Sequence, residues 1–508
     1  SSWQPISLEE TFIACMQLKP DKKDADLELN SSAFLNAPLN FIKLICVLIN
    51  AIIAHGHVPK GWLSGVILPL LKSADLDKSL LGSYRPITLS SVFGKIVDIL
   101  TLNRFRDMLS SCDRQFGFKK GLSTGHGTFV VREVVDYYLN NGSAVYACAL
   151  DMQKAFDRVN LVKLFSKLMF TGLPMHIVRI LFLLYSCLNL SVFWNGSLSP
   201  AFVTLNGVKQ GGILSPFLFC IYIDNLITGL ECLQVGCFVG NVYYGCVAYA
   251  DDIFLLAPSL SALRAMLNFC SQIGDNNDIL FNPNKSHCIK FCYSREIVQY
   301  SVVLQQTPLT WVNTITHLGH VLTYDNADSN DIQQRLFDFI SQTNYFIARF
   351  GHLPAPLKIR LFCNFCMSFY GCTLWSYFHK DLNNFDVAWR KAIRRIWLLP
   401  YRTHNNFIPF FVNGIDFRSI LYSRFVNFAH SCLQSSNCCI SFIARVASNS
   451  CLHNFGLNFC YCNFVYKLPC IPMLASLACE LVFMRSNDFN ANFSSEEINV
   501  ILNDVCCT

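Results

Sequence analysis

Two short apolar segments that end in acidic residues constrain the fold of this chain more than any other feature of its sequence. Residues 145–150 are apolar and are followed by Asp151, and residues 247–250 are followed by Asp251 and Asp252. Continuously apolar segments of this length predict strands that are buried on both faces. A carboxylate at the end of such a strand needs a charge partner or a metal ion. For Asp251 and Asp252 alone, a solvated hairpin tip is an equally good interpretation, because Asp is common in turns.

Carboxylates at the ends of neighbouring strands can bind hard divalent cations. Two magnesium ions held in this way align an attacking hydroxyl, an α-phosphate and a leaving pyrophosphate. We therefore expect Asp151, Asp251 and Asp252 to be catalytic residues and metal ligands. Lys285, within residues 281–286, is a candidate proton donor to the pyrophosphate. Taken alone, Lys285 is better interpreted as a surface lysine in a turn.

A glycine-containing loop lies between the two acidic segments, at residues 206–214. Gly211, which is followed by a second glycine, lets the backbone approach a flat ligand closely, and Gln210 is placed to hydrogen-bond a nucleotide or its template partner. Ser215 as a cap and Pro216 in the first turn predict that a helix follows. Such a loop is weak support for any function by itself, and its position between the acids is what makes it informative.

Composition narrows the class of protein. Hydrophobic residues make up 52% and charged residues 15% of the 508 residues, which excludes an intrinsically disordered chain. No stretch supplies the roughly 18 consecutive apolar residues of a transmembrane helix, so we expect no membrane partner. The net charge of +6 permits a polyanionic partner without requiring one. The 25 scattered cysteines and the lack of a leader or initiator Met predict an internal fragment of an intracellular protein.

A basic segment near residue 390 has the pattern of an amphipathic helix. Helical spacing places Trp389, Ile393 and Trp397 on one face and several cations on the opposite face. Such a helix packs by its apolar face and presents its cations to phosphate groups, and the alternative is an ordinary solvated face. The predicted nucleic-acid-binding residues are Arg390, Lys391, Arg394 and Arg395.

Together the motifs and their order resemble those of reverse transcriptases, and among these the non-LTR, LINE-type retrotransposon enzymes similar to jockey. Asp151 and Asp251 are 100 residues apart, a spacing typical of that branch. The resemblance extends from about residue 30 to residue 405. Its motifs are residues 84–87 and 115–124 (fingers), 149–157, 207–216, 249–252 and 282–286 (palm), and 317–319 (primer grip).

The resemblance implies a fold. We expect an α+β chain with the right-hand polymerase architecture, in which a small antiparallel sheet lies in the palm. Fingers and palm would occupy residues 59–330 and a helical, thumb-like domain residues 331–405. A helical N-terminal extension would precede them at residues 1–58, and a helical region of unknown role would follow at residues 406–508.

The resemblance also implies roles for individual side chains. Phe156 would be a steric gate that excludes the ribose 2′-OH, and Gln210 and Gly211 would contact the incoming nucleotide. Arg85 and Lys119 would meet the triphosphate or the template. Lys119 stands where the family usually carries arginine, so the charge is kept while the bidentate fork is lost.

The implied activity is that of an RNA-directed DNA polymerase, a nucleotidyltransferase. Such an enzyme extends a DNA 3′-OH on an RNA template, using deoxynucleoside triphosphates and two Mg²⁺ ions, for which Mn²⁺ is a substitute. Its partners would be the RNA template, a DNA primer or target and the deoxynucleotides, and the family is expected in nucleus and cytoplasm. The alternative is a degenerate or repurposed copy that binds RNA without catalysis.

Overall fold

The structure is a computed structural model, and it describes residues 4–24, 30–293, 300–412, 414, 416–450 and 453–466. Of the predicted C-terminal helical region at residues 406–508, the part beyond residue 466 lies outside the described residues. Helices and small sheets are mixed along the chain up to residue 323, and only helices follow among the described residues. The α+β class expected from the sequence is confirmed.

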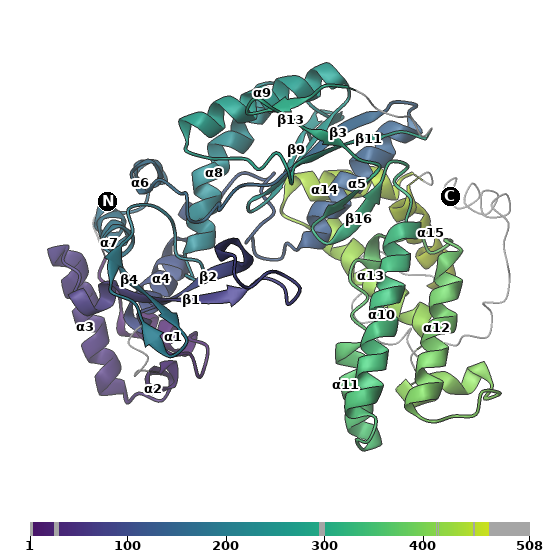
Figure 1. The fold of residues 1–508 in the computed structure, drawn as a ribbon, viewed down its shortest axis with the longest axis horizontal. Coiled ribbons are helices and arrows are strands. Elements are labelled where there is room, and N and C mark those ends of the chain that lie inside the picture. Colours follow the sequence, from purple (N-terminus) through teal and green to yellow (C-terminus); the bar gives the residue numbers. More distant parts are fainter. Residues whose placement is uncertain are drawn as a thin grey trace.

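A five-stranded sheet carries both acidic segments and forms the centre of the molecule (Figure 1). We call it the central sheet. Its strands are antiparallel except for the pair of β11 and β14. The two apolar segments of the sequence are neighbours in this sheet. The strand order is β14 (Thr310–Trp311), β11 (His287–Phe291), β3 (Val145–Leu150), β10 (Asp252–Ala257) and β9 (Cys246–Tyr249).

Both faces of the central sheet are covered, because alternate side chains of each strand enter different hydrophobic cores. Leu150 and Ile253 belong to a core shared with the N-terminal half of the chain, whereas Ala147 and Phe254 belong to a core shared with the C-terminal helices. This burial on two sides is why the strands are continuously apolar. The helices packed against the sheet are α5 (Thr124–Asn140), α8 (Ser215–Cys232) and α9 (Leu260–Asn276).

A second sheet lies next to the N-terminal helices, and we call it the outer sheet. Strand β1 pairs antiparallel with β2 and parallel with β4. The strands are β1 (Ser64–Leu71), β2 (Tyr84–Ser90), β4 (Asn189–Trp194), β5 (Ser197–Leu198) and β6 (Phe202–Val203).

Helix α8 begins where the sequence predicted it. Ser215 is its first residue and Pro216 lies in its first turn, although the Ser215 side chain does not cap the helix.

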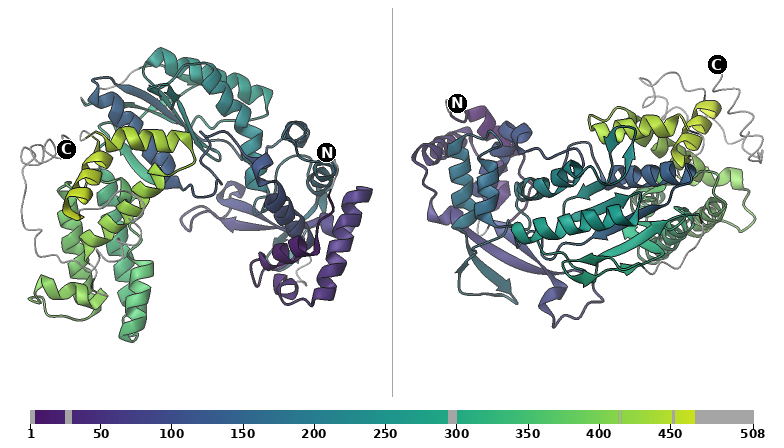
Figure 2. Two further views of the ribbon diagram at one scale, coloured as in Figure 1. Left: turned by 180° about the vertical axis from the view of Figure 1, so that it is seen from behind. Right: turned by 90° about the horizontal axis from the view of Figure 1, so that it is seen from above.

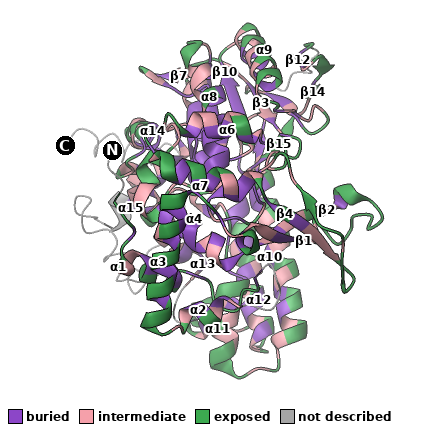
Figure 3. Ribbon diagram, turned by 90° about the vertical axis from the view of Figure 1, so that its left-hand side faces the viewer, coloured by how far each residue is buried: buried purple, intermediate pink, exposed green. Residues whose placement is uncertain are grey.

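The N-terminal helices form the first core together with α4, α6 and α7. Their exposed faces are on the outside of the molecule, where α3 is coloured largely as exposed in Figure 3. The helices are α1 (Leu8–Met16), α2 (Ser31–Leu35), α3 (Leu39–His55), α4 (Val92–Phe105), α6 (Leu161–Leu168) and α7 (Met175–Ser186), with short 3₁₀ helices η1 (Lys60–Leu63), η2 (Leu81–Ser83) and η3 (Arg106–Leu109).

The C-terminal helices pack against α5 and the far side of the central sheet, and Figure 2 shows the central sheet between them and the N-terminal helices. The first of them project together, and we call α10, α11 and α12 the helical arm. The helices are α10 (Ser329–Phe350), α11 (Ala355–Phe365), η4 (Cys372–Leu374), α12 (Asp381–Ile396), η5 (Asn405–Val412), α13 (Phe417–Leu433), α14 (Cys438–Ser448) and α15 (Asn454–Tyr466).

Short hairpins complete the described structure, and none of its helices is both long enough and apolar enough to cross a bilayer. The strands of these hairpins are β7 (Phe238–Val239), β8 (Val242–Tyr243), β12 (Val303–Leu304), β13 (Thr307–Pro308), β15 (Thr314–His317) and β16 (His320–Thr323).

Candidate active site

The hydrogen-bond register brings the acidic segments together at one end of the central sheet, which we call the acidic end. In the ladder between β3 and β10, Leu150 pairs with Ile253. The next position along each strand therefore sets Asp151 opposite Asp252. Directly opposed residues of antiparallel strands point to the same face of a sheet. Asp251 occupies the adjoining turn between β9 and β10.

Lys285 lies at the same end of the sheet, in the segment that leads into β11, and β3 separates β11 from the strand of Asp252. The ladder between β11 and β3 ends at the pair of His287 and Ala149, and Lys285 lies in a turn just before it, where its N–H donates to the Asn282 carbonyl at 3.1 Å. The lysine side chain is exposed. Its position suits a proton donor to a leaving group, and its exposure also fits an ordinary surface lysine.

The backbone of Asp151 is held by the segment that precedes β11. The Asp151 N–H donates to the Ser286 hydroxyl at 3.1 Å, and the Asp151 carbonyl accepts from the Asn282 N–H at 2.8 Å. Ser286 is completely buried. Two backbone hydrogen bonds to one neighbouring segment fix the direction in which the Asp151 carboxylate leaves the sheet.

Asp251 is positioned by a strained turn that a buried glutamine holds. Ala250 has a positive φ of 55°, which costs a non-glycine residue energy. The Gln115 Oε1 accepts from the Ala250 N–H at 2.8 Å, and the Gln115 Nε2 donates to the Ala250 carbonyl at 3.4 Å. The same Oε1 also accepts from the Gly117 N–H at 2.9 Å. Gln115 thus satisfies both backbone groups of the residue next to Asp251.

Gly117 is required by this arrangement for steric reasons. A Cβ at residue 117 would lie 2.6 Å from the Ala250 nitrogen, closer than any real contact. Phe116 extends the edge of the sheet, because its N–H donates to the Ala248 carbonyl at 2.7 Å. Residues 115–117 therefore run directly alongside β9 and the turn. This is a structural reason for the Gln-Phe-Gly motif of the sequence.

The carboxylates of the acidic end repel one another. Burial, together with the charges of Asp251 and Asp151, raises the pKa of Asp252 to about 6. Burial, followed by the charge of Asp151, also raises the pKa of Asp251, while the charge of Arg85 opposes the shift. No ion pair joins any of the three acids to a basic residue within the described part of the chain.

Uncompensated negative charge and oxygen donors are the chemistry that divalent metal ions require. A tighter group exists elsewhere: among the described residues, only Glu133, Asp136 and His453 place their candidate ligand atoms all within 4.8 Å of one another. The three acids of the sheet are therefore more widely spread than the ligands of one ion. Cations bound between these acids would offset the repulsion that contributes to two raised pKa values.

Gln210 is engaged with protein atoms. Its side-chain amide donates to an oxygen of Asp157 at 2.8 Å, and its carbonyl accepts from the Thr88 N–H at 2.7 Å. The predicted contact with a nucleotide therefore requires the side chain to leave Asp157. Gly211 has a φ of +104°, and a Cβ there would lie 3.3 Å from the Thr88 carbonyl. The segment that approaches residue 211 so closely that it favours glycine is β2.

Phe156 has a fixed ring orientation. Its ring stacks on that of Phe219 in α8, with centroids 5.0 Å apart and an angle of 15° between the planes. The Phe156 carbonyl accepts from the Val208 N–H at 2.8 Å, so the residue is also tied to the glycine loop. A ring that stacks on Phe219, on a backbone tied to the glycine loop, is a suitable rigid element for the predicted steric gate.

Arg85 and Lys119 differ in their access to the acids. Arg85 is exposed on β2, and its charge is close enough to lower the pKa of Asp251. The Lys119 Nζ donates to the Cys112 carbonyl at 2.7 Å and lies 3.5 Å from an Asp113 carboxylate oxygen. The structure brings Arg85 to the acidic end and directs Lys119 to its own loop.

The basic segment forms α12, whose apolar face is buried as predicted at Trp389 and Ile393. Three of its four predicted cations line one hollow, and the fourth, Arg395, does not. Arg390 is bridged to Asp386 at 3.2 Å, and Arg395 donates to the Asn344 amide oxygen on α10 at 2.8 Å. Helical spacing alone could not show these partners. Arg390, Lys391 and Arg394 line an open hollow, which we call the basic hollow, together with Val387 and residues 401–405.

Two buried charged side chains under the glycine loop, Lys209 and Asp98, were missed by the sequence analysis. The Lys209 ammonium is buried and lies 4.5 Å from the centre of the Tyr185 ring. Burial raises the pKa of Asp98 to about 6, and the charge of Lys209 opposes the shift. Gln115 was likewise given no role. Both depend on contacts between segments more than 100 residues apart, for which one sequence carries no signal.

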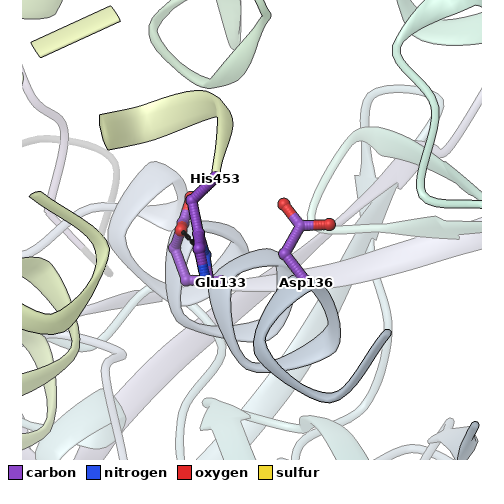
Figure 4. Close-up of side chains that lie close together, drawn as sticks. All are labelled: Glu133, Asp136 and His453. Atoms are coloured by element: carbon purple, nitrogen blue, oxygen red, sulfur yellow. Dashed lines mark hydrogen bonds and ion pairs between the residues drawn. The ribbon is translucent and has the colours of Figure 1, made fainter. Parts of the chain in front are cut away.

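Glu133, Asp136 and His453 form a buried cluster between α5 and the segment before α15 (Figure 4). The Glu133 carboxylate lies 2.9 Å from the His453 Nδ1, and the Asn326 amide donates to Asp136 at 2.7 Å. Each acid therefore already has a protein partner. Nothing beyond the proximity of these groups indicates a bound ion, and the cluster ties the C-terminal helices to α5.

Comparisons with known proteins agree with this geometry. The family described as reverse transcriptase (RNA-dependent DNA polymerase) matches residues 72–322. The RNA-directed DNA polymerase from mobile element jockey of Drosophila melanogaster is 24% identical over 426 residues, covering 78% of this chain and 44% of that protein. The probable RNA-directed DNA polymerase from transposon BS of the same species is 26% identical over 421 residues, covering 78% and 45%. The chain thus spans less than half the length of these relatives.

Among solved structures, telomerase from Candida tropicalis in complex with a TWJ fragment of telomeric RNA gives a TM-score of 0.41 at 11% identity. The match covers 84% of this chain and 65% of that chain, and its score is too low to say anything about this chain's activity. The family match and the relatives are sufficient without it. Residues 72–322 are a reverse transcriptase domain, and the chain belongs to the non-LTR retrotransposon reverse transcriptases.

Proposed function

We propose that this chain is the polymerase part of a longer retrotransposon protein and that it extends the 3′-OH of a DNA primer along an RNA template. The observation that carries the proposal is the acidic end of the central sheet, where the register sets Asp151 opposite Asp252 with Asp251 in the adjoining turn. The activity named for the jockey relative supports the same reaction.

The three acids are the proposed metal ligands. When bound, two Mg²⁺ ions, or Mn²⁺ in their place, would activate the primer hydroxyl and stabilise the charge that develops on the α-phosphate and the pyrophosphate. Asp151 and Asp252 would meet such ions from opposed strands, and Asp251 from the turn. The segment around Ser286 and the Gln115 side chain keep these carboxylates in place before substrate arrives.

The remaining side chains take roles around the nucleotide. Lys285 gives a proton to the leaving pyrophosphate, and Arg85 attracts the triphosphate. The Phe156 ring, held by its stacking on Phe219, occupies the space that a ribose 2′-OH would need. Gln210, once released from Asp157, and Gly211 contact the incoming nucleotide or its template partner. Lys119 supports the template through the loop that it holds.

We extend the proposal to the organisation of the chain. Residues 59–330 are assigned to fingers and palm and residues 331–405 to a thumb, with residues 1–58 and 406–508 as helical additions. The RNA template, the DNA primer or target and the deoxynucleotides are the proposed partners. Nucleus and cytoplasm are the proposed places of action, as the resemblance to the family implies.

Primer extension tests the function. The purified chain, an RNA template with an annealed DNA primer, deoxynucleotides and Mg²⁺ should give an extended product, and Asp251→Asn should lower its rate about 10³-fold or more. The surface variant Glu9→Gln, which removes the same charge from exposed α1, should retain the full rate. RNA binding by the wild type without any Mg²⁺-dependent product would overturn the proposal and favour the non-catalytic, RNA-binding copy.

A further inference from the structure

The basic hollow is a second concentration of charge, separate from the acidic end. It is open to solvent with a volume of about 380 Å³, and its lining includes Arg390, Lys391, Arg394 and Arg402 but no carboxylate. The nearest acid in sequence, Asp386, pairs only with Arg390. Cations gathered around one concavity repel each other, and an anion that enters the concavity relieves the repulsion.

The hollow is formed by α12 and the loop that follows it, which hydrogen bonds hold together. The Arg394 guanidinium donates to the Thr403 carbonyl at 2.9 Å and to the Asn405 side chain at 2.8 Å. These hydrogen bonds fold residues 401–405 back over the last turns of α12. Arg394 thus defines the floor of the hollow, and Lys391 and Arg402 remain exposed at its rim.

Exposed aromatic rings lie on the segment that follows α12, and one of them, Tyr401, lines the hollow. The relative exposure is 84% for Tyr401, 59% for Phe407 and 75% for Phe410. Soluble proteins rarely leave several large rings this exposed on one short segment without a use for them. Rings placed between cations are the surface that single-stranded nucleic acids need, because bases stack on the rings while the backbone follows the charge.

The location of the hollow separates it from the site of synthesis. Helices α10 and α11 lie between α12 and the outer sheet in the opposite views of Figures 1 and 2. The hollow belongs to α12 and the loop that follows it, and α12 is the helix of the arm that is farther from the outer sheet in these views. None of the residues that line the hollow belongs to the acidic end.

We propose that the basic hollow binds a single-stranded segment of nucleic acid outside the polymerase site, with phosphates at Lys391, Arg394 and Arg402 and bases stacked on Tyr401 and the phenylalanines beyond it. RNA and DNA share this chemistry, and the two are distinguished by the experiment. Binding here does not depend on polymerisation, so the proposal stands apart from the proposed function.

The test measures the affinity of fluorescent 12-nucleotide single strands for the full chain carrying Asp251→Asn, which removes synthesis as a factor. The double variant Lys391→Ala with Arg402→Ala should weaken binding about tenfold at ~0.1 M salt and lower the salt slope by about two. Both side chains are exposed, so the fold should remain. The double variant Lys43→Ala with Lys60→Ala, which removes the same charge from exposed N-terminal positions, should bind as the parent does.

Tyr401→Ala separates base stacking from charge. It should weaken the binding of oligonucleotides about three- to tenfold and leave the binding of inorganic polyphosphate unchanged. RNA and DNA strands compared in parallel show which sugar is preferred. Equal losses in the control pair and the hollow pair, or equal loss of polyphosphate and oligonucleotide binding in Tyr401→Ala, would overturn the proposal.

Discussion

The acidic end of the central sheet and the basic hollow of the arm both collect charge of one sign, but they are held in opposite ways. At the acidic end, buried groups from distant segments bond the backbone beside each acid, as Gln115 does at Ala250 and Ser286 at Asp151. In the hollow, exposed side chains stand on one continuous stretch of chain, with Arg394 as the main tie.

The difference follows from what each region must do. Aligning a hydroxyl, a phosphate and metal ions demands positions fixed to a fraction of an ångström, which buried backbone hydrogen bonds provide. Binding a flexible polyanion demands charge and accessible rings, and exposed side chains on one segment are sufficient for that. The two regions should therefore respond differently to the loss of a buried contact.

Gln115→Ala should produce the largest contrast between the regions. It leaves the Ala250 N–H and carbonyl without their partner next to a strained turn, which costs about 1–3 kcal/mol per buried group. If half of that cost appears in the transition state, primer extension slows about 10- to 100-fold. The expected loss is in kcat rather than in the KM for deoxynucleotides, because the acids move while the nucleotide contacts remain.

The matched control is Gln17→Ala, which truncates an exposed glutamine after α1. It should polymerise at the parental rate. Oligonucleotide binding at the basic hollow should be unaffected in both variants, as measured by fluorescence anisotropy. A folded Gln115→Ala protein that polymerises at the parental rate would show that the turn at Ala250 keeps its conformation without Gln115. The acidic end would then not depend on buried contacts from distant segments.

Gly117→Ala should have a smaller effect on the same turn. The added Cβ would lie 2.6 Å from the Ala250 nitrogen, so residues 115–117 must shift away from β9. We expect primer extension about tenfold slower and the melting temperature lowered by about 2–4 °C. Gly61→Ala, where a Cβ meets nothing within 4 Å, is the control and should change neither quantity. An unchanged rate in Gly117→Ala would mean that the turn tolerates movement of its support.

These variants also show which parts the sequence could predict. The apolar strands, the acids at their ends and the buried face of α12 follow from patterns within one segment, and the structure has them. The contacts of Gln115 with Ala250 span 135 residues, and those of Arg395 with Asn344 span 51. Which segments lie side by side depends on the packing of the whole chain, so a motif identified the acids but not the residues that hold them.

The smallest expected effect concerns pH and the cluster behind the acidic end. Burial, together with the charge of Glu133, raises the pKa of Asp136 to about 7. Burial alone would lower the pKa of His453, but its bond to Glu133 and the charges of Glu133 and Asp136 raise it above 6.5. Both groups therefore hold a proton more tightly in the folded chain than in the unfolded chain.

Folded-state pKa values above the unfolded ones give stability that is present at low pH and is lost as pH rises. For Asp136 the loss runs from about pH 4 to pH 7, and for His453 it begins near pH 6.5. Asp136→Asn removes the first contribution and keeps an oxygen that accepts from Asn326. The variant should melt with the parent at pH 5 and about 2–4 °C above it at pH 8.

The quantity to measure is the difference in melting temperature between Asp136→Asn and the parent. The pKa values of Asp98 and Asp252 are raised to about 6 in both proteins, so their effect cancels in that difference. Differential scanning fluorimetry from pH 5 to pH 8 gives it directly. Asp136 is not among the residues that line the basic hollow, so Asp136→Asn should leave oligonucleotide binding at each pH as it is in the parent. An equal pH dependence in Asp136→Asn and the parent would show that the cluster carries a bound cation or is solvated, since either would hold Asp136 ionised throughout.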